Sequence, residues 1–565
     1  MAASPHPEIF ELAEQFVDAE AEREPLLAIS LGRPVDGTSL GDFSAAGIAA
    51  RQASTFQALL ELDGAEPATE DERLAKAVML ERLASRQVLD QTGESLRSFS
   101  AITSPVAELR QAFELLPAET PDDVALAVDL LRAVGPALQS WRSGLRDSIV
   151  AGLPPARRQV LAVADQAGAH ADGGYGAVAR QIAASSFCDV DSSGLAAAAA
   201  EAEAACGDLA TWLRDEVAPR SDARDAVGED RYAVFFRAYT GLELQADDLF
   251  AWGLDQLVTV HEAMVALGEN LAPDATTLHE VASALDADPT RQIEGAAEIQ
   301  RWLEAVVATS VLEVAPAIEI DPRLRRCAVR LAPDGSASAP YYIGPSEDLS
   351  RPGTTWLPTL GSTTFHPWRL KTTWYHEAIP GHHLQDGTVV LERERLSSFQ
   401  RNLAWNSGHG EGWALYAEYL MDELGCFADP AERFGYLSAQ ALRAARVVVD
   451  LGMHLELEVP EVLRSVPGLE GSVGTPFDAT SAQILLEQWA LEPPVSAASE
   501  IDRYLGWPGQ APTYKVGQRA WLEVRAETAA RLGSAFTLPR FHDYALKLGP
   551  VGLPVLAEEL RRFEG

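Results

Sequence analysis

The sequence predicts a large, mainly α-helical protein with one small β-sheet. Across most of the 565 residues, apolar side chains recur every three or four positions, which is the period of a helix packed on one face. Capping residues, Pro and Gly stand at the ends of these segments, as at Thr120 before Pro121. Only residues 315–365 depart from the pattern. There, residues 328–332 and 340–343 flank the turn sequence Pro333-Asp334-Gly335 and predict a short β-hairpin.

Helices are expected along the whole chain. In the first part they are expected at about 8–33, 41–63, 67–92, 105–116, 121–149, 154–166 and the alanine-rich 195–217. In the second part they are expected at about 246–269, 276–286, 290–312, 368–395, 400–424, 430–456, 478–491, 498–505, 513–532 and 538–547. The Gly-rich stretch 167–176 is the best boundary, so we expect an N-terminal helical region, 1–175, that forms one compact unit with the remainder, 176–565.

Charge and hydropathy exclude two classes of partner. The chain has 45 Lys and Arg against 83 Asp and Glu, a formal net charge of −38. A field of that sign repels nucleic acid and anionic membrane, and no basic stripe offsets it. No uninterrupted apolar stretch reaches the ~18 residues of a membrane-spanning helix. We therefore expect neither nucleic acid nor membrane as a partner.

Cysteine usage and the N-terminal sequence predict a cytoplasmic protein. The four cysteines, Cys188, Cys206, Cys327 and Cys426, are scattered singly and predict no disulfide framework. The first 22 residues have neither a basic segment followed by an apolar one nor any other mark of a signal peptide.

The densest chemistry is a cluster of histidines and glutamates. Four of the 11 histidines lie between residues 376 and 409, beginning with the run Tyr-His-Glu-Ala-Ile-Pro-Gly-His-His at 375–383. Two imidazoles and a carboxylate are a typical ligand set for Zn²⁺ in an enzyme, and a further carboxylate beside them can act as a base. The sequence therefore predicts one Zn²⁺ per chain.

The spacing of the histidines differs from the usual His-Glu-x-x-His pattern. Pro380 occupies the position four residues after His376, and Gly381 follows it. A bulge at these two residues would bring His382 to the place of the usual second ligand. In an undistorted helix, His383 would lie on the same side as His376 but about 10 Å along the axis. We expect His376 and His382 to bind the metal, with His383 as the alternative to His382.

The glutamates have different expected roles. Glu377 follows a metal ligand directly and is the expected general base for a water activated by the metal. Glu411 follows the flexible turn Gly408-His409-Gly410 and is the expected third ligand. Glu418 lies two helical turns further on, either as support for a ligand or as the ligand itself. His409 is a loop histidine near the predicted site.

Four more residues are candidates for contact with a substrate. Tyr514 and His542 have side chains that can donate a hydrogen bond to an oxyanion. Arg351 and Lys515 can bind a substrate carboxylate, and the guanidinium of an arginine can do so through two parallel hydrogen bonds.

The motifs resemble a known bacterial family. The sequence HEAIPGHHLQ, with EGWALYAE about thirty residues later, is similar to the domain-of-unknown-function 885 family, which is grouped with the zincin-like metallopeptidases. Further similar segments are VGEDRY at 227–232, SRPG at 350–353, PGQAPTYKVGQ at 508–518 and FHD at 541–543, so the resemblance covers roughly residues 195–560. It implies a mainly helical zincin-like fold with a small sheet beside the metal-binding helix.

We therefore expect a zinc-dependent hydrolase, most readily a peptidase, with a peptide or small amide as its substrate. Three alternatives stay open: a hydrolase of some non-peptide amide, an inactive relative that binds metal or serves as a scaffold, and a helical interaction protein whose histidine cluster is incidental. Glu377 argues against the inactive relative, because a protein without turnover needs no base beside its ligands.

Overall fold

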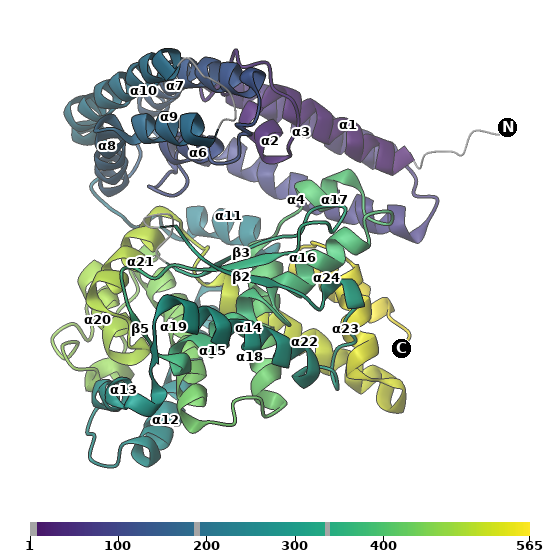
Figure 1. The fold of residues 1–565 in the computed structure, drawn as a ribbon, viewed down its shortest axis with the longest axis vertical. Coiled ribbons are helices and arrows are strands. Elements are labelled where there is room, and N and C mark those ends of the chain that lie inside the picture. Colours follow the sequence, from purple (N-terminus) through teal and green to yellow (C-terminus); the bar gives the residue numbers. More distant parts are fainter. Residues whose placement is uncertain (1–7, 186–191, 334–338) are drawn as a thin grey trace. The chain divides into compact units, whose positions relative to one another are not determined.

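The computed structural model describes residues 8–185, 192–333 and 339–565. The protein is mainly helical and has two small sheets (Figure 1), which confirms the predicted helical class. The chain divides into two compact units. The first contains residues 1–68, 83–227 and 502–508, and the second contains residues 69–82, 228–501 and 509–565. The Gly-rich stretch 167–176 falls within the first unit, where a turn at 172–173 joins two helices.

Every named secondary-structure element in the described part of the first unit is a helix. Its helices are α1 (Glu8–Arg23), α2 (Pro25–Ser30), α3 (Ala45–Gly64), α5 (Glu94–Arg97), α6 (Pro105–Ala112), α7 (Pro121–Val150), α8 (Arg157–Ala171), α9 (Gly174–Ser185), α10 (Ser192–Trp212), η1 (Leu213–Val217) and η2 (Ala218–Arg220). Helix α4 (Glu70–Gln91) belongs to the second unit up to Arg82 and to the first unit beyond it.

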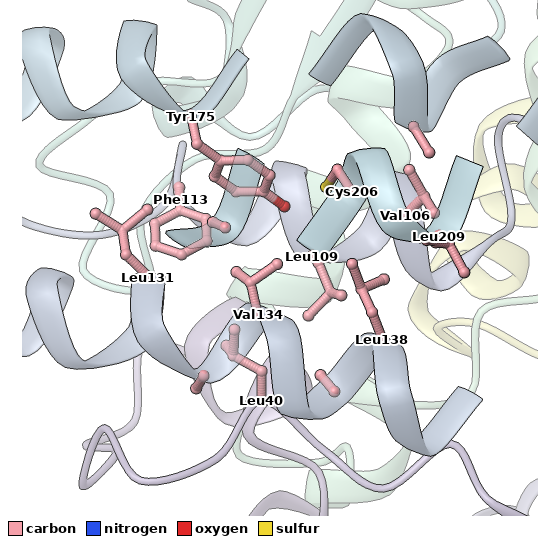
Figure 2. Close-up of a cluster of buried hydrophobic side chains, with 14 of the residues drawn as sticks. Leu40, Val106, Leu109, Phe113, Leu131, Val134, Leu138, Tyr175, Cys206 and Leu209 are labelled. Carbon is pink, nitrogen blue, oxygen red and sulfur yellow. The ribbon is translucent and has the colours of Figure 1, made fainter. Parts of the chain in front are cut away.

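The core of the first unit surrounds α10, which packs against α7, α8 and α9. Ala198, Ala199 and Ala202 lie on its buried face, where their small side chains let the neighbouring helices approach closely. Large side chains from α6, α7 and α9 fill the remaining space (Figure 2). Helix α7 begins as the sequence predicts, because Thr120 and Asp123 form a reciprocal capping box in front of Pro121.

The second unit holds the remaining helices and both sheets. Its helices are α11 (Glu229–Thr240), α12 (Ala246–Leu271), α13 (Leu278–Ala287), η3 (Pro289–Arg291), α14 (Ala296–Glu313), η4 (Pro322–Leu324), α15 (Pro367–Glu377), α16 (His382–Leu391), α17 (Ser398–Asn402), α18 (Ser407–Glu423), α19 (Pro430–His454), η5 (Glu461–Ser465), α20 (Ala479–Ala490), α21 (Pro494–Gly506), α22 (Thr513–Leu532), η6 (Gly533–Ala535), α23 (Leu538–Lys547) and α24 (Leu553–Arg562). The last five residues of α21 belong to the first unit.

The predicted hairpin is wrong, although both of its strands exist. Strands β2 (Ala328–Leu331) and β3 (Tyr341–Ile343) do not pair with each other, because β4 (Thr354–Leu357) lies between them. Strand β4 pairs in parallel with β2 and antiparallel with β3. It is the most buried of the three strands, so it takes the position with hydrogen-bonded neighbours on both sides. Of the predicted turn, residues Asp334 and Gly335 lie outside the described residues.

A second sheet pairs β1 (Ile293–Glu294) antiparallel with β5 (Thr364–Phe365), just before α15. The three-stranded sheet lies beside α16, since the hydroxyl of Tyr342 on β3 lies 3.0 Å from Nδ1 of His383. A small sheet next to the histidine-bearing helices is therefore present, as the sequence predicted.

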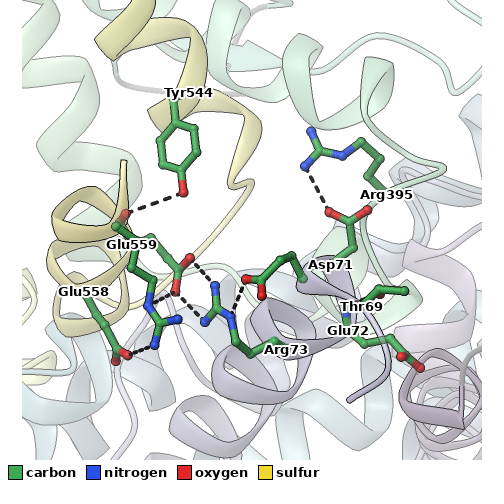
Figure 3. Close-up of polar contacts among 10 residues, drawn as sticks. Thr69, Asp71, Glu72, Arg73, Arg395, Tyr544, Glu558 and Glu559 are labelled. Atoms are coloured by element: carbon green, nitrogen blue, oxygen red, sulfur yellow. Dashed lines mark hydrogen bonds and ion pairs between the residues drawn. The ribbon is translucent and has the colours of Figure 1, made fainter. Parts of the chain in front are cut away.

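Ion pairs connect distant segments within the second unit (Figure 3). The guanidinium of Arg73 donates to both carboxylate oxygens of Glu559, at 2.8 and 2.5 Å, and Glu559 is buried. Asp71 accepts a hydrogen bond of 2.9 Å from Arg395. A bidentate ion pair with a buried carboxylate is strong and geometrically specific. The pair between Arg73 and Glu559 therefore holds the first residues of α4 against α24.

Two predictions about the whole chain can be compared with the structure. Cys206, Cys327 and Cys426 are free and buried, while Cys188 lies outside the described residues. Within the described ranges, no helix has the length and apolar character needed to cross a membrane.

Candidate metal centre

The histidine motif is divided between two helices. Helix α15 ends at Glu377 and α16 begins at His382, so the predicted single helix over 368–395 with a bulge at Pro380-Gly381 is wrong. The interruption nevertheless brings His382 next to His376, with ring centroids 4.8 Å apart and planes at 89°.

Gly381 makes this tight connection possible. Its N–H donates to the carbonyl of Tyr375, six residues back, at 3.0 Å. A Cβ at Gly381 would lie only 1.8 Å from the carbonyl oxygen of His376, so any side chain there would collide with the backbone. The backbone can therefore pass this close to the carbonyl of His376 only with glycine at position 381.

The third member of the cluster comes from α18. The predicted helix over 400–424 is two helices, α17 and α18, and the predicted flexible turn Gly408-His409-Gly410 is already the first turn of α18. The side chain of Asn406 caps this helix by accepting the N–H of His409 at 3.0 Å. Glu411 follows in the second turn, and its Oε2 atom points toward the two histidines.

His376, His382 and Glu411 form a group that can hold a metal ion. Their nearest ligand atoms all lie within 4.8 Å of one another. Oε2 of Glu411 is 3.4 Å from Nε2 of His376 and 3.5 Å from Nε2 of His382. This oxygen is buried and makes no hydrogen bond to any described residue. A buried carboxylate oxygen without a partner, facing two imidazole nitrogens, fits the nitrogen and oxygen ligands that Zn²⁺ prefers.

The histidines and glutamates of the group shift each other's pKa values. Burial lowers the pKa of His376, but the carboxylates of Glu411 and Glu418 outweigh it and raise the pKa to about 9. Burial also raises the pKa of Glu411, but the two histidines that face its carboxylate reverse this and lower it. A zinc ion needs unprotonated imidazole nitrogens, so its uptake would release protons from this group.

Glu418 holds the ring of His376 from behind. Its Oε1 lies 2.9 Å from Nδ1 of His376, and its Oε2 accepts a 2.5 Å hydrogen bond from the hydroxyl of Thr372. Glu418 is 1% exposed and lies outside the three-residue group. A carboxylate on the far nitrogen of a metal-binding histidine fixes the orientation of the ring and its tautomer. Glu418 thus lies where a supporting carboxylate is expected, whereas Glu411 belongs to the group of three residues that could hold an ion.

His383, the alternative ligand, lies elsewhere. Its Nε2 is 2.9 Å from the carbonyl oxygen of Leu324 and its Nδ1 is 3.0 Å from the hydroxyl of Tyr342. The carbonyl can only accept, so Nε2 carries the proton and Nδ1 accepts from Tyr342. Burial lowers the pKa of His383 to about 4, which favours this neutral form. Both ring nitrogens are therefore engaged away from the cluster.

A cavity of about 570 Å³ opens onto the cluster. Glu377 and Tyr514 both line it, together with His376, His382 and Glu411. The ring of Tyr514 stacks on that of His376 with centroids 6.3 Å apart. Burial raises the pKa of Glu377, which the two neighbouring histidines only partly offset. The structure therefore brings the predicted base and one predicted oxyanion donor to the same cavity as the predicted metal ligands.

His542 does not reach this cavity. Its Nδ1 is 2.8 Å from the carbonyl oxygen of Ala317, and its Nε2 is 2.7 Å from the hydroxyl of Tyr416. The residue is fully buried, and burial lowers its pKa to about 4. The predicted role of His542 as an oxyanion donor has no support in this geometry, because one ring nitrogen is paired with Tyr416 of α18 and the other with the carbonyl of Ala317 in the segment after α14.

The two predicted carboxylate-binding residues also lie away from the cavity lining. Lys515 is buried and donates to the amide oxygens of Gln440 and Gln518, at 2.8 and 2.7 Å. Arg351 is exposed on a turn, where its N–H donates to the hydroxyl of Ser346 at 2.9 Å. His409 is buried as well, and its Nδ1 lies 3.3 Å from Nε2 of Gln385.

Helix α19 supplies cavity residues that the sequence analysis missed. Arg443 and Arg446 line the cavity, and the guanidinium of Arg446 lies 4.7 Å from the centre of the Tyr514 ring. Other missed residues of the lining are Tyr341, Tyr342, Asp386, Trp405, Glu492 and Glu500. A signal was present in the sequence. Within the apolar face of the helix, polar residues recur at positions 440, 443, 446, 450 and 454, and such residues need buried partners or a cavity.

Comparison with known proteins shows the family and the fold. A sequence model of the family "Bacterial protein of unknown function (DUF885)" matches residues 25–560, so the match begins well before residue 195, where the motif resemblance starts. A crystal structure of a candidate lipoprotein from Colwellia psychrerythraea is 19% identical, with a TM-score of 0.84 over 98% of each chain. A candidate lipoprotein of unknown function from Shewanella oneidensis is 18% identical, with a TM-score of 0.76 over 98% of this chain and 99% of that one. No curated protein matches the chain.

Proposed function

This chain belongs to the DUF885 family of bacterial proteins of unknown function, and we propose that it is a zinc-dependent hydrolase that cleaves peptides. One observation carries the proposal. The unpartnered buried oxygen of Glu411 faces Nε2 of both His376 and His382, and the carboxylate of Glu377 lines the same cavity. Three ligands of this kind, with a free carboxylate beside them, are the composition of a hydrolytic zinc site.

The expected metal is one zinc ion per chain, held by His376, His382 and Glu411. When bound, zinc acts as a Lewis acid that polarises a carbonyl group and makes water easier to deprotonate. Glu418 keeps Nε2 of His376 directed at the metal position by holding the opposite ring nitrogen.

Glu377 is the proposed general base. The higher pKa that burial produces makes its carboxylate a stronger base. It takes a proton from the water as the water oxygen attacks the peptide carbonyl carbon. The same proton passes to the amide nitrogen as the carbon–nitrogen bond breaks, so the products are a carboxylic acid and an amine. Tyr514 is the proposed donor to the carbonyl oxygen while negative charge develops there.

The cavity suits a short peptide. Its volume of about 570 Å³ lies within the range of pockets for small molecules, and it is lined by both aromatic and charged side chains. A peptide supplies the amide bond on which Glu377 and Tyr514 would act. The cytoplasmic location expected from the sequence stays a prediction, since the solved neighbours named above are candidate lipoproteins of other bacteria.

A digest of a peptide library by the zinc-loaded protein, read by mass spectrometry, tests the proposal. We expect cleavage that a chelator abolishes and that zinc restores. Glu377→Gln keeps the shape of the side chain but cannot accept the proton, so it should retain zinc and lose roughly 10²- to 10⁴-fold in rate. Absence of cleavage by the zinc-loaded wild type would contradict the proposal, and an unchanged rate for Glu377→Gln would contradict its base.

A further inference from the structure

The cavity contains two arginines that differ in their partners. Arg446 forms an ion pair with Glu500, with Nη2 and Oε2 2.7 Å apart. Arg443, one helical turn earlier on α19, makes no hydrogen bond or ion pair with any residue that the structure describes, and its Nε is buried without a partner. A guanidinium has five N–H donors, and leaving them unpaired at a half-buried position costs free energy. The buried Nε–H of Arg443 is therefore available to a hydrogen-bond acceptor that enters the cavity.

The position of Arg443 relates it to the proposed zinc site. Its guanidinium carbon lies 5.9 Å from the centre of the Tyr514 ring, and the same ring lies 6.3 Å from the ring of His376. The guanidinium and His376 are therefore separated by no more than about three or four extended residues, at ~3.4 Å for each residue. A substrate group bound at Arg443 would therefore lie only a few residues, along the peptide substrate, from a peptide bond held at the proposed metal site.

The other charged residues of the cavity lining indicate which kind of chemical group Arg443 can bind. Oε2 of Glu492 accepts a hydrogen bond from the hydroxyl of Ser496 at 2.7 Å, and Glu500 is neutralised by Arg446. Arg443 is the arginine of the lining without an ion-pair partner among the described residues, and it acts on the nearby Glu377 only through longer-range attraction, which lowers the pKa of that carboxyl against the larger effect of burial. A carboxylate matches the geometry of its planar guanidinium through two parallel hydrogen bonds.

We propose that Arg443 binds the C-terminal carboxylate of the substrate, so that the enzyme is a carboxypeptidase that releases one to three residues from the end of a peptide. This inference rests on the proposed zinc-dependent peptidase function. It assigns to Arg443 the role that the sequence analysis had given to Arg351 and Lys515, neither of which lines the cavity.

The test compares one peptide sequence in three forms: both ends free, N-acetylated, or C-terminally amidated. We expect the wild type to cleave the first two equally well and the amide at least 10-fold more slowly in kcat/KM, because an amide cannot form the ionic pair. In Arg443→Met, the free-acid peptide should lose about 10- to 100-fold while the amide changes little, so that discrimination between them disappears. Arg433→Met is the matched control, because Arg433 lies on the same helix but is exposed and paired with Asp422.

A binding measurement separates recognition from turnover. Calorimetry of the metal-free protein with D-Ala-D-Ala-D-Ala and its amide should show tighter binding of the free acid in the wild type and in Arg433→Met, but equal binding in Arg443→Met. Equal cleavage and equal binding of acid and amide by the wild type would overturn the inference while leaving the peptidase proposal standing. A penalty from acetylation in place of amidation would overturn it in favour of recognition of the N-terminal amine. If the zinc-loaded wild type cleaves no peptide, the peptidase proposal itself fails.

Discussion

Nδ1 of His376 lies 2.9 Å from Oε1 of Glu418, while Nε2 of the same ring faces Glu411 at 3.4 Å. The imidazole is therefore held between two carboxylates with different surroundings. Glu418 also accepts a hydrogen bond from the hydroxyl of Thr372, whereas the oxygen of Glu411 that faces His376 has no hydrogen-bond donor among the described residues. The asymmetry makes Glu418 a support and leaves Glu411 available for an ion.

The first prediction concerns metal content. Freshly purified wild type should contain or take up about one zinc per chain, and His376→Ala should lose it because one of three protein ligands is removed. Elemental analysis by mass spectrometry measures this. His279→Ala is the control, since His279 is exposed on α13. Wild type that neither contains zinc nor takes it up would contradict the metal site.

Glu418→Gln should weaken zinc binding without abolishing it. The amide can still contact Nδ1 of His376 but carries no charge, and the loss of such a supporting carboxylate typically costs 10- to 100-fold in affinity. Competition with a zinc-binding dye measures the affinity. Thr372→Val should have a smaller effect in the same direction, because it removes only the hydrogen bond to Glu418. An affinity of Glu418→Gln equal to that of the wild type would show that Glu418 does not support the ligand.

Tyr514→Phe should retain zinc and lower kcat. The phenol is the proposed donor to the developing oxyanion, and removal of a single such donor costs roughly 10²- to 10³-fold. Because the ring remains, its contacts with His376 and Arg446 should be preserved. Steady-state kinetics on the peptide found in the library digest provide the measurement. A change confined to KM would assign Tyr514 to substrate binding alone.

Gly517→Ala should destabilise the packing of α22 on α18. A Cβ at this position would lie 1.9 Å from the carbonyl oxygen of Gly408 and 2.6 Å from Cα of Gly412. The two helices would have to separate, at a cost of about 1–3 kcal/mol or more. Thermal unfolding should show a lower Tm. The control is Gly471→Ala, where a Cβ meets nothing within 4 Å. Equal stability of the two variants would contradict this close approach.

Stability should fall as the pH decreases from about 6.5 toward 4, in part because of His542. Burial lowers the pKa of this residue to about 4, so in this range the unfolded chain binds a proton that the folded protein does not. A depressed histidine pKa therefore opposes folding at acidic pH, by roughly 3 kcal/mol at the low end. His542→Asn, which keeps a donor near Ala317, should show a shallower decrease of Tm with pH. An identical slope would show that His542 does not contribute.

Local features of the chain were predictable from sequence alone. Helix α22 begins and ends at Thr513 and Leu532 as expected, and α7 begins at its capping box, because caps, Pro and apolar periodicity act over a few residues. His376, His382 and Glu411 could be proposed together because residues of the types that bind zinc lie close in the sequence there, and because Pro and Gly between the histidines predicted a distortion of the helix.

Tertiary structure decided what depends on distant neighbours. Strand β4 lies between β2 and β3, although β2 and β3 are closer to each other in sequence. Its side chains are mostly buried, and this burial favours the central position in the sheet. His542 and Lys515 became buried donors, and Arg443 of α19 faces the cavity in place of Arg351. Residue type and spacing determine which side chains can bind a metal or move a proton. Which of them share one cavity is determined by the packing of helices far apart in sequence, and no local pattern records that packing.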